Sequence, residues 1–289
     1  MKWFDYAAPT SLPEAVRLLA ERPQARLLAG GTDLIVQMRA GRKETDLVID
    51  VKRIPELNVL HWDPGSGLTL GAAVPCHRIY EDRAVRAHLP SLAEVAGIIG
   101  GTQIQGRASV GGNLCNASPS ADTAPLLIAL GARCRIASAA STREVAVEDF
   151  CVAPGRNALA SGEMLVSIHI PAPPPHSGAQ YLRFIPRNEM DIAVAGAGVA
   201  VSLDRGEFRS ARVALAAVAP APLFVREAGD YLAGKPVSAE LIAEAAELAK
   251  AAARPITDMR GTARYRRHLC GVLTRRALEA AVAAAQGGR

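Results

Sequence analysis

The sequence predicts an α+β protein of two domains, the first of which divides into two smaller α/β units. Three observations lead to this prediction. Strand-like and helix-like segments alternate over the first 170 or so residues, a proline-rich stretch interrupts the chain at 171–178, and three successive strand patterns followed by two long helices occupy the rest. With 289 residues, 49% of them hydrophobic, the chain can bury more than one core.

The first unit begins with a helix at 10–21, where Ser11 and Glu14 form a capping-box pair and apolar residues recur at helical spacing. A strand, a tight glycine turn, a short helix and a second strand are then expected at 26–29, 30–32, 33–39 and 45–54. These segments predict a small α/β unit at the start of the chain.

The second unit and the last domain follow the same logic. Strands are expected at 66–75, 132–138, 142–150 and 163–171, with helices after Pro75, at 89–100 and at 123–130, the last ended by Gly131. Beyond the proline-rich stretch, strands at 179–187, 191–204 and 208–220 predict a three-stranded antiparallel sheet, and helices are expected at 238–250, capped by Ser238, and at 262–285.

Composition excludes several classes of protein. The net charge of +5 and pI near 9.1 come from arginines spread along the chain, which argues against nucleic-acid binding. The exception is a basic group at 260–267, which is either a solvated face or a surface that docks a partner protein. The start of the chain has no apolar leader, and the longest apolar stretch, 192–203, is too short to span a bilayer.

Cysteines and histidines give no sign of a metal or catalytic site. The five cysteines (76, 115, 134, 151 and 270) are odd in number and widely spaced, which favours a reducing, cytoplasmic location over a disulfide framework or a zinc or iron–sulfur ligand set. The six histidines are scattered, and no Ser/His/Asp set or paired carboxylates stand out. We therefore expect no catalytic residue and no metal ligand in this chain.

Two glycine pairs carry the main chemical signal. Gly30-Gly31 lies between a strand and a helix start, where free amides and the helix dipole suit a phosphate, although an isolated glycine turn is usually only a turn. A second small-residue run, 106–122, contains Gly111-Gly112. Neither matches the GxGxxG or P-loop pattern. Two such turns favour one long ligand with a central diphosphate, such as FAD, held between two subdomains.

The segments LLAGGTDLIVQMR, TQIQGRASVGGNLCNASPSADTAPLLIALGA, EMLVSIHIP and RFIPRNEMDIAVAGAGVAV occur in this order. Together they resemble the FAD-binding medium subunit of molybdenum hydroxylases, the xanthine dehydrogenase and aerobic carbon monoxide dehydrogenase family, over nearly the whole chain. The resemblance implies a two-subdomain FAD-binding fold of the vanillyl-alcohol oxidase (PCMH) type and a C-terminal α+β domain. The implied boundaries are 1–55, 56–172 and 177–289.

The resemblance also implies the cofactor-binding residues. Residues 27–34 would wrap the diphosphate through main-chain amides, and 109–113 would form a second clamp. Asp122 would bind a ribose or a nearby polar group, although it could equally cap the following helix. Ile99 and Leu165 would contact the flavin, and Arg183 would lie near it. The full set is Leu27, Leu28, Ala29, Gly30, Gly31, Thr32, Asp33, Leu34, Ile99, Thr102, Ser109, Val110, Gly111, Gly112, Asn113, Ser118, Asp122, Leu165 and Arg183.

The implied function is electron transfer. FAD on this chain would take electrons from two [2Fe–2S] clusters on a small partner subunit, which receives them from a molybdopterin cofactor on a large one, in an (αβγ)₂ assembly. One branch of the family, the 4-hydroxybenzoyl-CoA reductases, holds an iron–sulfur cluster in an extra cysteine-rich loop of this subunit. The segment 122–149 here has only Cys134 and no such insertion, so the resemblance implies no cluster in this chain. The alternatives are a stand-alone FAD-dependent oxidase of the vanillyl-alcohol oxidase type and a regulatory FAD-binding protein. The substrate and the electron acceptor stay open.

Overall fold

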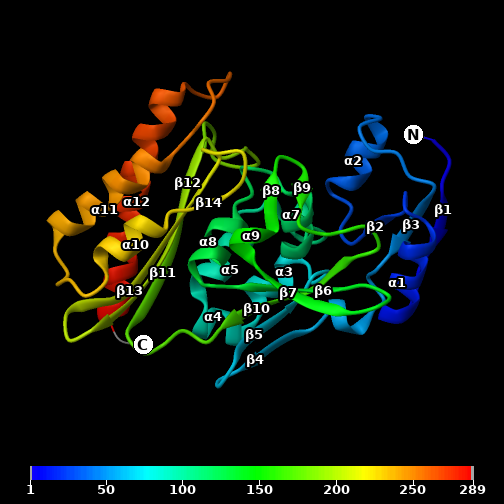
Figure 1. The fold of residues 1–289 in the computed structure, drawn as a ribbon, viewed down its shortest axis with the longest axis horizontal. Coiled ribbons are helices and arrows are strands. Elements are labelled where there is room, and N and C mark those ends of the chain that lie inside the picture. Colours follow the sequence, from blue (N-terminus) through cyan, green and yellow to red (C-terminus); the bar gives the residue numbers. More distant parts are fainter. Residues whose placement is uncertain (1, 288–289) are drawn as a thin grey trace.

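The computed structural model describes residues 2–287. It contains three bodies arranged along the long axis of the molecule, from the N-terminal segment through a central body to a C-terminal sheet covered by helices (Figure 1). Each body is built around a sheet of its own. The predicted α+β class is confirmed.

A small parallel sheet forms the first body. Its strand order is β1 (Asp5–Ala7), β3 (Leu47–Asp50), β2 (Arg26–Leu28). Helix α1 (Leu12–Glu21) begins at Ser11, whose hydroxyl accepts the amide of Glu14 as the capping-box pattern predicts. Helix α2 (Leu34–Arg39) follows the first glycine pair, and a 3₁₀ turn, η1 (Pro55–Leu57), leads into the next body.

The central body is an antiparallel sheet covered by short helices. The strand order is β4 (Leu60–Asp63), β5 (Gly67–Gly71), β10 (Met164–Pro171), β6 (Arg133–Ala137), β7 (Thr142–Ala146). The helices are α3 (Cys76–Glu81), α4 (Arg83–His88), α5 (Pro90–Ala96), α6 (Thr102–Gln105), α7 (Val110–Asn116), α8 (Thr123–Ala129) and α9 (Val147–Phe150). A two-stranded ribbon, β8 (Cys151–Ala153) and β9 (Arg156–Asn157), precedes β10.

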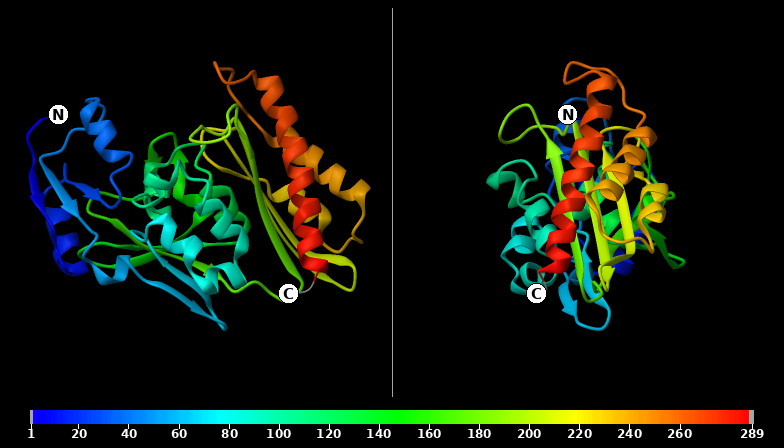
Figure 2. Two further views of the ribbon diagram at one scale, coloured as in Figure 1. Left: turned by 180° about the vertical axis from the view of Figure 1, so that it is seen from behind. Right: turned by 90° about the vertical axis from the view of Figure 1, so that its left-hand side faces the viewer.

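The third body is an antiparallel sheet with helices on one face, as Figure 2 shows from two further directions. Its strands are β11 (Ser177–Phe184), β12 (Ala195–Asp204), β13 (Glu207–Ala216) and β14 (Leu223–Phe224). Its helices are α10 (Arg226–Leu232), α11 (Ala239–Ala252), which Ser238 caps as expected, and α12 (Ala263–Gln286), which lies across β11 and β12. The sheet contains the three predicted strands and one additional short strand, β14.

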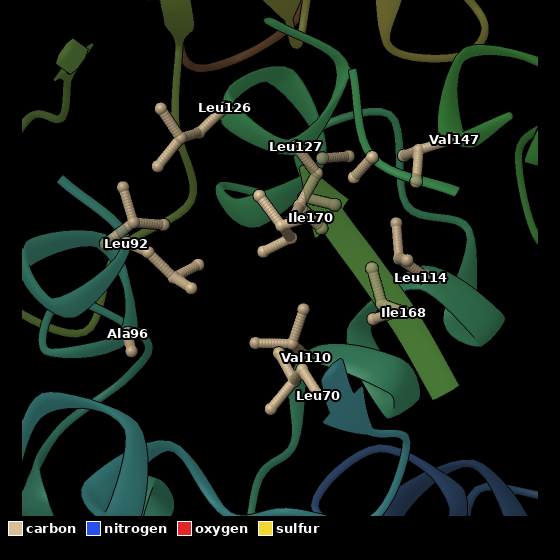
Figure 3. Close-up of a cluster of buried hydrophobic side chains, with 14 of the residues drawn as sticks. Leu70, Leu92, Ala96, Val110, Leu114, Leu126, Leu127, Val147, Ile168 and Ile170 are labelled. Atoms are coloured by element: carbon tan, nitrogen blue, oxygen red, sulfur yellow. The ribbon is translucent and has the colours of Figure 1, made fainter. Parts of the chain in front are cut away.

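Strand β10 lies at the centre of the molecule and faces two cores. Met164 and Val166 pack against the first body, whereas Leu165 and Ile168 belong to the central core. A β-bulge separates the two pairings with β6, because Leu165 pairs with Ile136 and Ser167 with Arg135. The extra residue allows Leu165 and Ile168 to face the same side despite their odd spacing. Figure 3 shows Ile168 and Ile170 among leucine, valine and alanine side chains from β5, α5, α7 and α8.

Two local predictions were wrong. Residues 109–113 do not form an open turn, because Ser109 caps a helix that already includes Gly111 and Gly112. The expected strand at 142–150 ends at Ala146, and 147–150 is one turn of helix whose Val147 and Phe150 are buried. In both places the buried apolar side chains decide the conformation, and the sequence pattern alone did not reveal which side chains would be buried.

The predicted domain boundaries stay predictions. Their outer limits, residues 1 and 289, lie outside the described residues. Three separate clusters of buried side chains, one for each body, support the division into three parts. Between residues 2 and 287 no helix combines the length and the apolar character needed to cross a membrane.

Candidate functional site

The two glycine-rich segments lie against each other. Gly30 touches the main chain of Arg107 so closely that any side chain at position 30 would overlap the Arg107 carbonyl. The Arg107 guanidinium in turn donates from Nε to the Gly30 carbonyl over 3.3 Å. Glycine is therefore required at position 30 by a contact between the first and central bodies, and this contact brings the two predicted clamps together.

The first segment presents a row of free amides. Gly31 adopts φ of +77°, a left-handed conformation that glycine tolerates best. Across the described chain, the backbone N–H groups of residues 30–34 find no acceptor, so the turn between β2 and α2 leaves successive donors unpaired. Asp33 occupies the N-cap position of α2 without capping it, and desolvation raises the pKa of its carboxyl. These donors suit an anionic group.

The second segment is the start of helix α7. The Ser109 hydroxyl accepts the amide of Gly112 over 3.0 Å. A side chain on Gly111 would lie 2.5 Å from the Ala72 carbonyl oxygen, so this glycine is required by packing within the protein. A Cβ on Gly112 would approach only the Ser109 hydroxyl, at 3.1 Å, and otherwise faces open space. Only Gly112 thus leaves room for a ligand.

A cavity of about 590 Å³ lies between the two segments. Such a volume is within the range of small-molecule and cofactor sites. The predicted residues that line it are Leu27, Ala29, Gly30, Gly31, Thr32, Asp33, Leu34, Ile99, Ser109, Gly111, Gly112, Asn113 and Leu165. Both glycine pairs, both predicted flavin contacts and the α2 N-terminus therefore face one space, although they are separated by up to 135 positions in the sequence.

Hydrogen bonds connect the two walls of the cavity. Gln37 on α2 donates from Nε2 to Asn116 Oδ1 on α7 over 2.8 Å. Thr123 donates its hydroxyl to Asn113 Oδ1 over 2.6 Å, which fixes the orientation of that amide. Gln37 and Asn116 both line the cavity. The polar wall is thus held in place by side chains from both bodies.

The other predicted site residues lie outside the cavity lining. Leu28 and Val110 belong to the same segments but are not part of the lining, and Val110 is buried in the central core (Figure 3). Thr102 begins helix α6 and is exposed. The Ser118 hydroxyl pairs with that of Ser120 over 3.0 Å. Their proposed contacts with a cofactor stay predictions.

Asp122 and Arg183 form a buried pair between the central body and the third. Asp122 Oδ2 lies 2.6 Å from the Arg183 guanidinium, Oδ1 accepts the Tyr181 hydroxyl over 2.7 Å, and both members of the ion pair are about 10% exposed. The same guanidinium donates to the Ile98 carbonyl over 3.1 Å, one residue before Ile99. Burial raises the pKa of Asp122, and the Arg183 charge opposes that effect. Asp122 does not cap helix α8.

One loop in the lining was missed by the sequence analysis. Residues 157–163, from the last residue of β9 to the residue before β10, contribute six side chains or backbone segments to the cavity: Asn157, Leu159, Ala160, Ser161, Gly162 and Glu163. The only sequence signal was Gly162 directly before a predicted strand, which is typical of any turn. Cys115 also lines the cavity, and burial raises the pKa of its thiol to about 12, so it is a neutral thiol at physiological pH.

Two sequence families match the chain. Residues 2–173 match the FAD binding domain in molybdopterin dehydrogenase, and residues 180–281 match the CO dehydrogenase flavoprotein C-terminal domain. The first match contains both glycine segments, the loop 157–163 and Leu165, that is, the whole lining of the cavity.

Curated relatives and solved structures agree with these matches. The chain is 32% identical over 288 residues to the xanthine dehydrogenase FAD-binding subunit of Escherichia coli O157:H7, covering 98% of this chain and 99% of the relative. It is 34% identical to the carbon monoxide dehydrogenase medium chain of Afipia carboxidovorans, with 98% of each covered. Carbon monoxide dehydrogenase from Hydrogenophaga pseudoflava superposes with a TM-score of 0.93 at 33% identity, covering 98% of each chain. Quinoline 2-oxidoreductase from Pseudomonas putida 86 gives 0.89 at 32% identity, covering 99% of each.

Proposed function

Because the chain belongs to the family of FAD-binding medium subunits of molybdenum hydroxylases, we propose that it carries FAD as the electron-transfer subunit of a molybdenum-dependent hydroxylase or dehydrogenase. The observation that carries this proposal is the cavity between the first and central bodies, in which both glycine segments face one another. Its lining has a polar region that fits the diphosphate of a dinucleotide and an apolar region that fits a flat ring system.

The polar region fits a diphosphate. Five successive amides at 30–34 lack acceptors among residues 2–287, and the cavity has room beside Gly112 on the opposite wall. Lys43 and Arg26 also line the cavity, which adds positive charge on the side of the first body. Backbone amides and cationic side chains both form hydrogen bonds with phosphate oxygens. These groups would hold the diphosphate of FAD.

The apolar region fits a flat ring system. Ile99, Ile104, Leu57 and Leu165 contribute aliphatic side chains to the same cavity. Leu165 is buried and held by the bulge in β10, so its position is fixed by the sheet rather than by a loop. These residues would exclude water from the ring of the cofactor and orient it.

Bound FAD would supply the redox chemistry, taking electrons from [2Fe–2S] clusters and passing them to an external acceptor. The clusters and the molybdopterin cofactor would belong to a small and a large partner subunit, since the relatives named above are FAD-binding subunits and medium chains. We extend the proposal to an (αβγ)₂ assembly in the cytoplasm. The substrate would be chosen on the large subunit, so nothing in this chain selects it.

The first test is purification of the tagged chain from its own host, followed by a visible absorbance spectrum and a denaturing gel. Flavin bands over an iron–sulfur background, with one larger and one smaller companion chain, are expected. Flavin bands from the chain alone would instead favour a self-contained flavoprotein. A colourless chain that binds no added FAD would overturn the proposal.

The second test places a side chain in the cavity. Gly112→Leu projects into open space, so it should weaken FAD binding by about a hundredfold while the apo-protein stays folded. Gly106→Leu is the matched control, because Gly106 is also helical in conformation, has room for a side chain and does not line the cavity. Gly111 is unsuitable, since a side chain there would meet Ala72. Equal FAD affinity in the two variants would contradict the site.

A further inference from the structure

The loop 157–163 forms a wall of the cavity that the glycine segments do not supply. It runs from the last residue of β9 to the start of the central strand β10, and a Cβ on Gly162 would lie 3.8 Å from Ala20 of helix α1. The turn depends on Gly162, whose φ is +78°. Loops are generally more mobile than the elements that they connect, so the contacts that hold this main chain determine how well it keeps its place in the cavity wall.

The first end of the loop is fixed to helix α7. Asn157 donates from Nδ2 to the Cys115 carbonyl over 2.8 Å, and its Oδ1 accepts the amide of Leu159 over 3.1 Å. The Asn157 side chain therefore ties the loop to the helix that carries the second glycine pair. Because Asn157 and Cys115 both line the cavity, this hydrogen bond lies at the cavity wall.

The second end is fixed by an ion pair. Arg143 on β7 binds both oxygens of Glu163, each over 2.7 Å, and donates to the Ala158 carbonyl over 2.8 Å. The same carboxylate accepts the amide of Ala160 over 2.7 Å. Glu163 is only 13% exposed at its side chain. Arg143 and Glu163 thus fix the main chain at 158 and at 160, and Ala160 lines the cavity.

We propose that the loop 157–163 is a third binding element for the FAD of the proposed function, and that Arg143 and Glu163 are positioning residues that preorganise it. The pair itself adds no new donor to the cofactor, because both Glu163 oxygens are already bonded to Arg143 and Ala160. Its effect is to remove the entropy that an unfixed loop would lose when the cofactor binds. This proposal rests on the proposed function, since it requires that FAD occupies the cavity.

The test compares FAD dissociation constants and the unfolding temperatures of the apo-proteins for matched variants of the full chain. Glu163→Gln and Arg143→Gln should each weaken FAD binding about fivefold. Arg143→Lys should give an intermediate value, because lysine keeps the charge but cannot bind both oxygens in the same way. Glu144→Gln is the control: Glu144 is the next residue on β7, pairs with Arg133 over 2.9 Å and does not line the cavity.

The outcomes separate this inference from the proposed function. Weaker FAD binding in the Glu163 and Arg143 variants, with no change in the Glu144 control, supports the positioning role. If all the variants bind FAD as wild type does, or if affinity falls only in proportion to the unfolding temperature of the apo-protein, the inference is wrong and the proposed function stands. If wild type itself binds no FAD, the proposed function fails first.

Discussion

The two junctions of this chain differ in how they are filled. Between the first and central bodies lies the cavity, crossed by the Gly30–Arg107 contact and the Gln37–Asn116 hydrogen bond. Between the central and third bodies, helix α8 is buried against β12 and β13. At that second junction a side chain on Gly198 would lie 2.6 Å from the main chain of Pro125. One junction keeps space for a ligand and the other removes it.

The two junctions also differ in how their charged and polar groups are paired. The filled junction contains two arginine–carboxylate pairs, Arg183 with Asp122 and Arg212 with Glu148, and each arginine also donates to a backbone carbonyl of the central body. At the open junction, the backbone donors of residues 30–34 have no partner within the described part of the protein. The difference teaches that the junction with the third body is filled by the protein's own contacts, whereas the junction with the first body keeps a cavity beside its contacts.

The largest effect is expected from substitutions that remove an ion pair at the filled junction. Arg183→Gln leaves Asp122 buried without its cation, and we expect a loss of about 3 kcal/mol in the free energy of unfolding. Arg212→Gln should cost about 1 kcal/mol, because the Arg212–Glu148 pair is more exposed. Urea denaturation of the two apo-proteins measures both losses. Equal losses would show that the buried pair holds the junction no more firmly than the exposed one does.

The second prediction concerns the effect of added FAD on the open junction. Added FAD at a hundred times its dissociation constant should stabilise the chain by about 2.7 kcal/mol. Hydrogen exchange should slow at residues 30–34 and 109–113, while amides of α8 and β12 keep their rates. Protection that rises equally at both junctions would argue against a cofactor site confined to the first.

The pH dependence of the loop contact gives a smaller effect. Hydrogen bonds from Arg143 lower the pKa of Glu163 below its ordinary value of 4.5. A carboxyl with a lowered pKa contributes fully above its unfolded pKa, and the contribution is lost as the pH falls through the folded pKa. The roughly fivefold difference in FAD affinity between wild type and Glu163→Gln should therefore be constant near neutral pH and shrink only when the pH falls below the ordinary pKa of 4.5. Fluorescence titration with FAD across this range measures it.

The smallest effect is expected at Cys115. Cys115→Ala should change the free energy of unfolding and the FAD affinity by no more than about 0.5 kcal/mol, because Asn157 binds the backbone carbonyl of this residue. The pKa of about 12 keeps the thiol protonated, so alkylation by iodoacetamide should be slow at neutral pH. Rapid alkylation with loss of flavin would assign the thiol a role at the site.

The sequence predicted most of the fold because helix and strand patterns are local. It also predicted that the two glycine segments lie at one site, because runs of small residues can be recognised directly in the sequence. It did not reveal why each glycine is needed: Gly30 and Gly111 make room for Arg107 and Ala72, which are 77 and 39 positions away in the chain. The loop 157–163 was missed for the same reason. Its proposed role depends on the contact between Arg143 and Glu163, and no local sequence pattern pairs these two residues.

Strand β10, which contributes to two cores, limits how the sequence of this protein can vary during evolution. Met164 and Val166 serve one core and Leu165 and Ile168 serve the other, with the bulge between them setting which side chain faces which core. A conservative substitution at any one position alters a single core. A deletion or insertion within 164–168 would place side chains of one set in the core of the other and move Leu165 out of the cavity. We therefore expect homologues to vary in residue type along this strand but not in its length.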